Sequence, residues 1–223
     1  MVDRYSIAQN PHLITKEKGS WKPIYNAHPT QKLPILHTPD QISYFHWGLM
    51  SKWSNNKVMS SKLFNLDVER AFEKTSFRKS LQSRRCVALA DGYYVWRQIG
   101  KKQHTPYYHY LPQQQLFGIA GIWESSEDLE GNSFDCFMCL MRQSTSPSHT
   151  TEEQPIMVLS NDVNEWLNPD LSEESIRELI RKSEEIEVAT HAVSPAIRNT
   201  ENNSSTLTEP AMPADQHGNY TLF

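Results

Sequence analysis

Cysteine is scarce in this chain, which holds only Cys86, Cys136 and Cys139. An odd number of cysteines argues against a disulfide framework. Cys136 and Cys139 form one Cys-x-x-Cys pair, but in a strand-like run their three-residue separation puts them on opposite faces, which argues against a shared thiolate zinc site. The histidines show no metal-ligand spacing with carboxylates or thiols, so we expect no metal and no cofactor. The sequence therefore predicts core thiols in a reduced, cytoplasmic protein.

Long apolar runs are also missing. No stretch approaches the roughly 20 residues of a membrane-spanning helix, and the start, Met-Val-Asp-Arg-Tyr, lacks the basic-then-apolar pattern of a signal peptide. We therefore expect no membrane partner. The chain has 223 residues, 38% of them hydrophobic, and shows no repeat or linker. This predicts a single, monomeric domain over residues 1–223, with residues 199–223 forming a loop-rich tail.

The chain also lacks a surplus of basic residues. The formal net charge is −4, whereas proteins that bind nucleic acids usually carry excess positive charge. A function on DNA would therefore require a local basic patch.

The most informative stretch spans residues 84–97, Arg-Arg-Cys-Val-Ala-Leu-Ala-Asp-Gly-Tyr-Tyr-Val-Trp-Arg. Residues 86–90 form an apolar run of strand length, and residues 93–96 are aromatic and β-branched, as in a second strand. Asp91-Gly92 between them is a strong turn signal. The stretch predicts a hairpin. Its side chains either lie beside a cleft or only pack in the hydrophobic core.

The remaining strands are expected at short intervals, at residues 33–37, 42–47, 106–111, 116–123 and 134–141. The last three suggest an antiparallel meander that closes toward a barrel.

Helices are expected between and after these strands. Val68, Ala71 and Phe72 fall at helical spacing. Asp170 or Ser172 is expected to begin a later helix that buries its apolar face. The sequence thus predicts an α+β fold that is mostly β.

Several motifs occur in the order and spacing of one known family. They are Trp47-Gly48-Leu49, Trp53, Asn65, Arg85-Cys86, Ala90-Asp91-Gly92-Tyr93-Tyr94-x-Trp96, Ala120-Gly121-Ile122-Trp123-Glu124, Pro155-Ile156-Met157-Val158-Leu159 and Trp166-Leu167. The chain resembles the SRAP family, the SOS-response-associated peptidase-like proteins that process abasic sites. The resemblance runs to about residue 200. It implies one domain with a barrel-like, bifurcated antiparallel sheet, peripheral helices and a cleft for single-stranded DNA.

The resemblance also implies a chemistry. Family members use an amino-terminal Cys, exposed when Met1 is removed, whose amine and thiol condense with the aldehyde of an abasic site into a thiazolidine crosslink. An Asn, a Glu and a His assist.

This sequence departs from that pattern at three of the four positions. Val2 stands at the Cys position, Val95 at the Glu position and Thr151 at the His position, with His149 two residues away. Asn65 stands at the Asn position. Its side chain either contacts the ligand or serves only to satisfy buried backbone groups. The candidate catalytic residues are therefore Asn65 and His149.

The family's DNA contacts are matched by Arg4, Pro29 and Trp53, our candidate DNA-binding residues. Arg4 can hold a phosphate and Trp53 can stack a base. Asp67 replaces a family Arg, which should weaken phosphate binding.

Two hypotheses follow. In the first, the chain is a pseudoenzyme that still binds single-stranded or abasic DNA. In the second, it is a scaffold that presents the old cleft to a protein or a small ligand. An enzymatic route also stays open, because the free amine of Val2 can form a Schiff base with an aldehyde once Met1 is removed.

Overall fold

The computed structural model describes residues 2–10, 21–49, 63–99, 103–113, 115–127, 130–143 and 153–212. Its strands are β1 (Arg4–Ile7), β2 (Ile24–Ala27), β3 (Lys32–Thr38), β4 (Gln41–Trp47), β5 (Asn65–Asp67), β6 (Arg85–Ala90), β7 (Gly92–Ile99), β8 (Gln103–Tyr110), β9 (Phe117–Glu127), β10 (Ser133–Gln143), β11 (Glu153–Pro155), β12 (Met157–Val158) and β13 (Ala189–Ala192). Its helices are α1 (Val68–Glu73), α2 (Thr75–Ser83), α3 (Val163–Trp166) and α4 (Glu173–Lys182), with 3₁₀ turns η2 (Ser160–Asp162), η3 (Ser183–Glu185), η4 (Pro195–Arg198) and η5 (Ser205–Thr208).

The larger sheet closes on itself. Its strand order is β11-β10-β4-β3-β6-β9-β12, and β9 also pairs with β10, so β10, β4, β3, β6 and β9 form a closed ring. Strand β10 then splits its pairing, with β4 beside Cys136 and Phe137 and β5 beside Cys139 to Met141. The barrel-like, bifurcated sheet of the expected α+β fold is confirmed.

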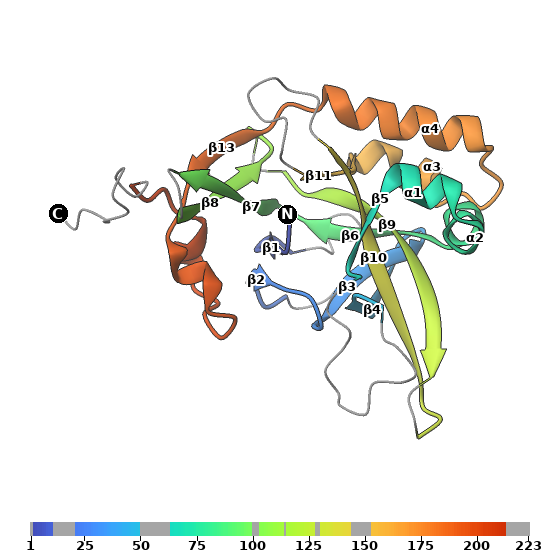
Figure 1. Ribbon diagram of the computed structural model, residues 1–223, viewed down its shortest axis with the longest axis horizontal. Coiled ribbons are helices and arrows are strands. Elements are labelled where there is room, and N and C mark those ends of the chain that lie inside the picture. The colour runs from blue at the N-terminus through green and yellow to red at the C-terminus, as the bar shows by residue number, and fades with distance from the viewer. Residues whose placement is uncertain are drawn as a thin grey trace.

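A second sheet of five strands lies beside the barrel, in the order β13-β8-β7-β1-β2 (Figure 1). The predicted hairpin over residues 84–97 is therefore wrong, although both of its strands exist. Strand β6 pairs with β3 and β9 in the barrel, whereas β7 pairs with β1 and β8 in the second sheet. Asp91 marks a crossing between sheets. The expected meander is confirmed for β9 and β10, which pair antiparallel in the barrel, and is wrong for β8, which belongs to the second sheet.

Gly92 is explained by close packing. A Cβ atom there would lie 2.2–2.3 Å from ring atoms of Tyr108 on the neighbouring strand. The Tyr108 hydroxyl in turn lies 2.8 Å from Ser6 Oγ, which donates to the Asp91 carboxylate. The chain can therefore cross from one sheet to the other here only because residue 92 is a glycine, which has no side chain.

Alternate side chains of β6 pack into two different apolar clusters, one on each face of the strand. Val87 and Leu89 face an apolar cluster beneath the four α-helices. Cys86, Ala88 and Ala90 face a second cluster in the barrel interior. Successive strand residues point to opposite faces, so a strand with both faces covered is apolar throughout.

Helix α4 shows the predicted start. Ser172 caps it by accepting from the Ser175 N–H, and Ile176, Leu179 and Ile180 are buried. Within the described ranges, no helix has both the length and the apolar character needed to cross a membrane.

Testable prediction at the sheet crossing. We expect Gly92→Ala to lower the free energy of unfolding by about 1–3 kcal/mol, because the added methyl group overpacks the buried Tyr108 ring. Urea unfolding measures the change. Combining it with Tyr108→Ala removes the clash, so the double variant should lose less than the sum of the two single losses. An additive double variant would contradict the packing explanation.

Candidate nucleic-acid interface

The amino-terminal residues lie between the two sheets. Strand β1 pairs with β2 on one side and β7 on the other, so residues just before Arg4 lie deep in the molecule (Figure 1). The side chain of Val2 is 0% exposed, and that of Val95 on β7 is 1% exposed. Both belong to the barrel-interior cluster. The positions expected to hold a nucleophile and a carboxylate thus hold packed hydrocarbon.

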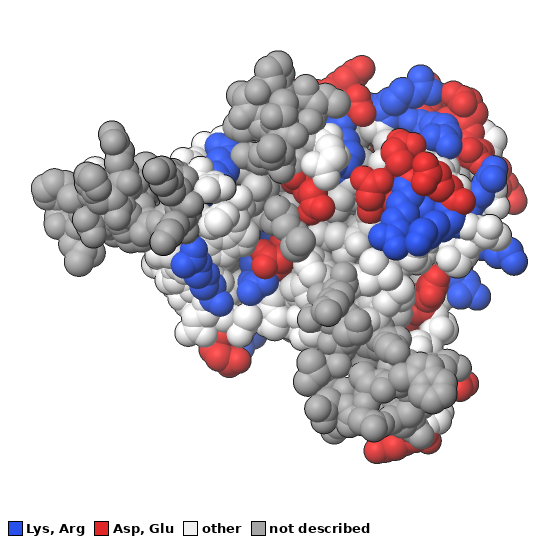
Figure 2. All heavy atoms as spheres, viewed as in Figure 1, with Lys and Arg blue, Asp and Glu red and all other residues white. Residues whose placement is uncertain are grey.

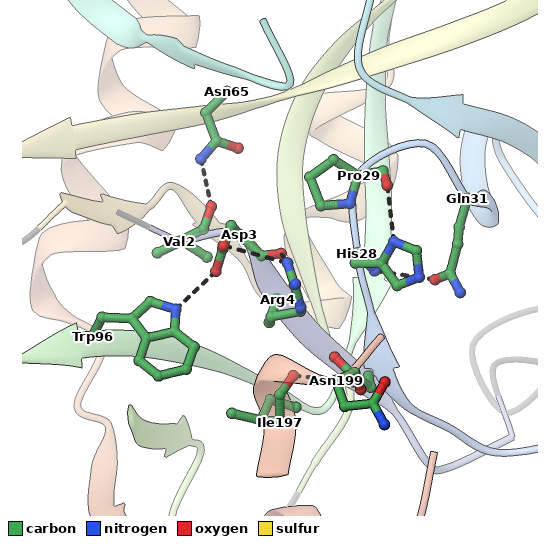
Figure 3. Close-up of polar contacts among 11 residues, drawn as sticks. Val2, Asp3, Arg4, His28, Pro29, Gln31, Asn65, Trp96, Ile197 and Asn199 are labelled. Carbon is green, nitrogen blue, oxygen red and sulfur yellow. Dashed lines mark hydrogen bonds and ion pairs between the residues drawn. The ribbon is translucent and has the colours of Figure 1, made fainter. Parts of the chain in front are cut away.

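Asn65 contacts the Val2 backbone. It lies at the start of β5, where parallel pairing with β10 fixes its position. Its Nδ2 donates to the Val2 carbonyl at 2.6 Å (Figure 3). Its Oδ1 is buried and has no hydrogen-bond partner among the described residues. A buried carbonyl group needs such a donor, so Asn65 fixes the chain at residue 2.

Arg4 is held by its neighbour. Its Nη1 donates to the Asp3 carbonyl at 2.7 Å and forms an ion pair with the Asp3 carboxylate at 3.3 Å. The Trp96 indole N–H also donates to that carboxylate, at 3.0 Å (Figure 3). The Arg4 side chain is only 13% exposed. Its charge is therefore partly neutralised and largely covered. Sequence analysis missed Asp3, although its place beside Arg4 was a visible signal.

Pro29 lies in a tightly fixed turn between β2 and β3. The His28 N–H donates to Gln31 Oε1 at 3.0 Å, and His28 Nδ1 donates to the Pro29 carbonyl at 2.9 Å. Thr30 has a φ of +83°, unusual for a β-branched residue, and its N–H donates to the Trp47 carbonyl at 2.9 Å. Strained backbone of this kind persists only where surrounding contacts hold it.

Asp67 has a structural role that the sequence did not reveal. It caps α1 by accepting from the Arg70 N–H at 3.1 Å. The remaining candidates, Trp53, His149 and Thr151, lie outside the described residues.

The cysteines do not replace the missing thiol. All three are buried and none is in a disulfide, as predicted for core thiols. Burial raises the pKa of the Cys86 and Cys139 thiols far above the ordinary value, which suppresses the nucleophilic thiolate. In the part of the chain that the structure describes, no three His, Cys, Asp or Glu side chains are grouped as metal ligands.

The visible charges are mixed. On the face shown in Figure 2, Lys and Arg alternate with Asp and Glu over α1, α2 and α4, while the surface around β1 and β2 carries fewer charged residues, again of both signs. Ion pairs such as Arg78–Glu173 at 2.7 Å account for part of this mixing.

Known protein families and individual proteins share sequence similarity with this chain. The profile of the SOS response associated peptidase (SRAP) family matches residues 1–200. The abasic site processing protein YoqW of Bacillus subtilis is 28% identical over 197 residues, covering 86% of this chain and 88% of that protein. The abasic site processing protein HMCES of Rattus norvegicus is 27% identical, covering 94% of this chain and 70% of its own length.

A solved structure supports the fold. A Bacteroides thetaiotaomicron protein superposes with a TM-score of 0.70 at 23% identity, covering 82% of each chain. A phage-related protein from Bordetella bronchiseptica gives a TM-score of 0.66 at 17% identity, with 86% of this chain and 93% of that chain covered. The profile match spans most of the sequence, and this chain therefore belongs to the SRAP family.

Proposed function

We propose that this chain is a DNA-binding SRAP protein that recognises single-stranded or abasic-site DNA without forming the thiazolidine crosslink. The relatives named above are abasic site processing proteins, which supports DNA as the partner. The observation that carries the loss of crosslinking is the apolar packing of Val2 and Val95.

The chemistry follows from the side chains present. A thiazolidine ring needs an amine and a thiol on the same residue, and Val2 supplies only the amine. An amine alone gives an imine with an aldehyde, which water reverses. At the Glu position, the hydrocarbon of Val95 cannot move a proton. The proposed complex is therefore noncovalent, or at most a reversible imine.

Asn65 is a positioning residue in this proposal. Its hydrogen bond to the Val2 carbonyl holds the start of the chain between the sheets. Its unpartnered Oδ1 leaves an acceptor beside the same backbone.

One observation favours the second function, a scaffold that binds a protein or small ligand. The Arg4–Asp3 ion pair reduces the positive charge available to a phosphate. The two functions differ in salt dependence, because binding through phosphates weakens as salt rises.

Testable prediction on DNA binding. We expect the natural chain, produced with residue 2 first, to retard a single-stranded oligonucleotide that contains one abasic site, more strongly at 50 mM than at 200 mM salt. We expect no adduct on a denaturing gel without borohydride. No retardation at either salt concentration would overturn the DNA proposal and favour the scaffold. An adduct that forms only with borohydride would show that the Val2 amine reacts as an imine.

Testable prediction on the missing thiol. We expect Val2→Cys to form a heat-stable adduct with the abasic oligonucleotide without borohydride, and Val2→Cys/Val95→Glu to form it faster. The thiol closes the ring and the carboxylate moves protons. Denaturing gels over time measure the yield.

The matched control is Val2→Ala, which removes volume without adding a thiol, and circular dichroism confirms that each variant is folded. If Val2→Cys binds the oligonucleotide and still gives no adduct, the missing thiol is not what stops the crosslink.

Testable prediction on Asn65. We expect Asn65→Ala to lower the free energy of unfolding by about 1–3 kcal/mol, because the buried Val2 carbonyl loses its donor. Urea unfolding measures the loss. The exposed Asn132→Ala is the control and should change stability by less than about 0.5 kcal/mol. Equal effects of the two variants would argue against the positioning role.

A further inference from the structure

We propose that a groove beside the Pro29 turn binds the continuation of the DNA strand. The groove has a volume of about 650 Å³ and is bounded by residues 21–33, by Tyr44 on β4 and by residues 200–203 after η4. This proposal rests on the proposed function, and it adds an interaction surface that the candidate residues of the sequence do not include.

The groove carries exposed basic residues, whereas Arg4 near the start of the chain is paired with Asp3 and largely covered. Lys22 and Lys32 both line it and are exposed. Neither side chain forms an ion pair or hydrogen bond with another described residue, so both ammonium groups are available to phosphates. Glu201 is the one carboxylate among the lining residues. Two cations against one anion favour a negatively charged ligand.

Aromatic surface accompanies these charges. Tyr44 lines the groove and is 47% exposed, one of few large apolar side chains left in solvent. Half-buried Trp21 also lines it, with its indole N–H donating to the Ile7 carbonyl at 2.9 Å. Exposed rings beside free cations are the usual recipe for single-stranded nucleic acid, because unpaired bases stack on the rings. A duplex keeps its bases stacked internally, so the ligand that fits this groove is a single strand.

The groove adjoins the turn that carries Pro29. His28 and Gln31 line it, and both belong to the turn that carries Pro29 (Figure 3). Ile24 and Asn26 of β2 line the groove, and β2 pairs with β1, which begins at Arg4. A strand held near Arg4 and Pro29 therefore has a direct path into the groove.

The far wall is rigidly attached. Asn203 Oδ1 accepts from the Tyr25 N–H at 2.7 Å, and its Nδ2 donates to the Pro23 carbonyl at 3.0 Å. Asn26 Nδ2 lies within hydrogen-bonding distance of the carbonyls of Ile197, Asn199 and Asn202, at 2.9–3.2 Å. The groove thus exists before any ligand binds, which lowers the entropic cost of binding.

The test compares dissociation constants for a single-stranded oligonucleotide across a salt series. We expect Lys22→Gln/Lys32→Gln to reduce the slope of log K against log salt by about 1.4, or about 0.7 for each lost phosphate contact. We expect Tyr44→Ala to weaken binding about fivefold or more, with little change in slope. Glu201→Gln should tighten binding, which a purely structural role would not explain.

The matched control is Arg181→Gln/Lys182→Gln, which removes two positive charges from the end of α4, on the other side of the molecule from β2 (Figure 1). Its slope should equal that of the natural chain. Thermal melting confirms that all variants are folded.

The outcomes separate the two proposals. If the natural chain binds and the groove variants behave like the control, the groove proposal is overturned and the proposed function stands. If the natural chain does not bind the oligonucleotide at any salt concentration, both fail.

Discussion

The structure depends on the way in which Asp91 holds the crossing between the two sheets. Its carboxylate accepts from the Ser6 hydroxyl and from the backbone N–H groups of Ala8 and Gln9, and its own N–H donates to the Ser6 carbonyl. A carboxylate that accepts several hydrogen bonds while buried is held firmly in place. These bonds tie β1 to the end of β6. The position of Val2 at the centre of the molecule follows from that link.

The same arrangement places both substituted positions, Val2 and Val95, in one apolar cluster. Val95 lies on β7 and Val2 precedes the neighbouring strand β1, and both side chains belong to the barrel-interior cluster. Hydrocarbon in both places is compatible with the core, whereas a carboxylate at Val95 without a partner would cost free energy on burial. The family fold is therefore compatible with valine at both residue 2 and residue 95. Asn65 keeps a structural bond at the same point.

Charge has been redistributed around this centre. Arg4 is paired with Asp3, and the acidic residue Asp67 caps α1, so neither position offers an unpaired positive charge. The unpaired lysines Lys22 and Lys32 lie farther along, in the groove lined by the carboxy-terminal segment. A negative net charge is thus compatible with a local basic surface. The segment after residue 199, which we expected to be a loop-rich tail, forms a wall of that surface as far as it is described.

The sequence by itself determined the family, the strands, a start of α4 at Asp170 or Ser172 and the absence of a thiol at residue 2. These properties depend on residue identity and on local periodicity. Only the tertiary structure decided that Asp91-Gly92 joins two sheets, because a turn signal does not specify which strands will pair. It also decided that Trp96 bonds Asp3 and that residues 21–44 meet residues 200–203. Such contacts join residues that are far apart in the sequence, so local patterns of residue type do not reveal them.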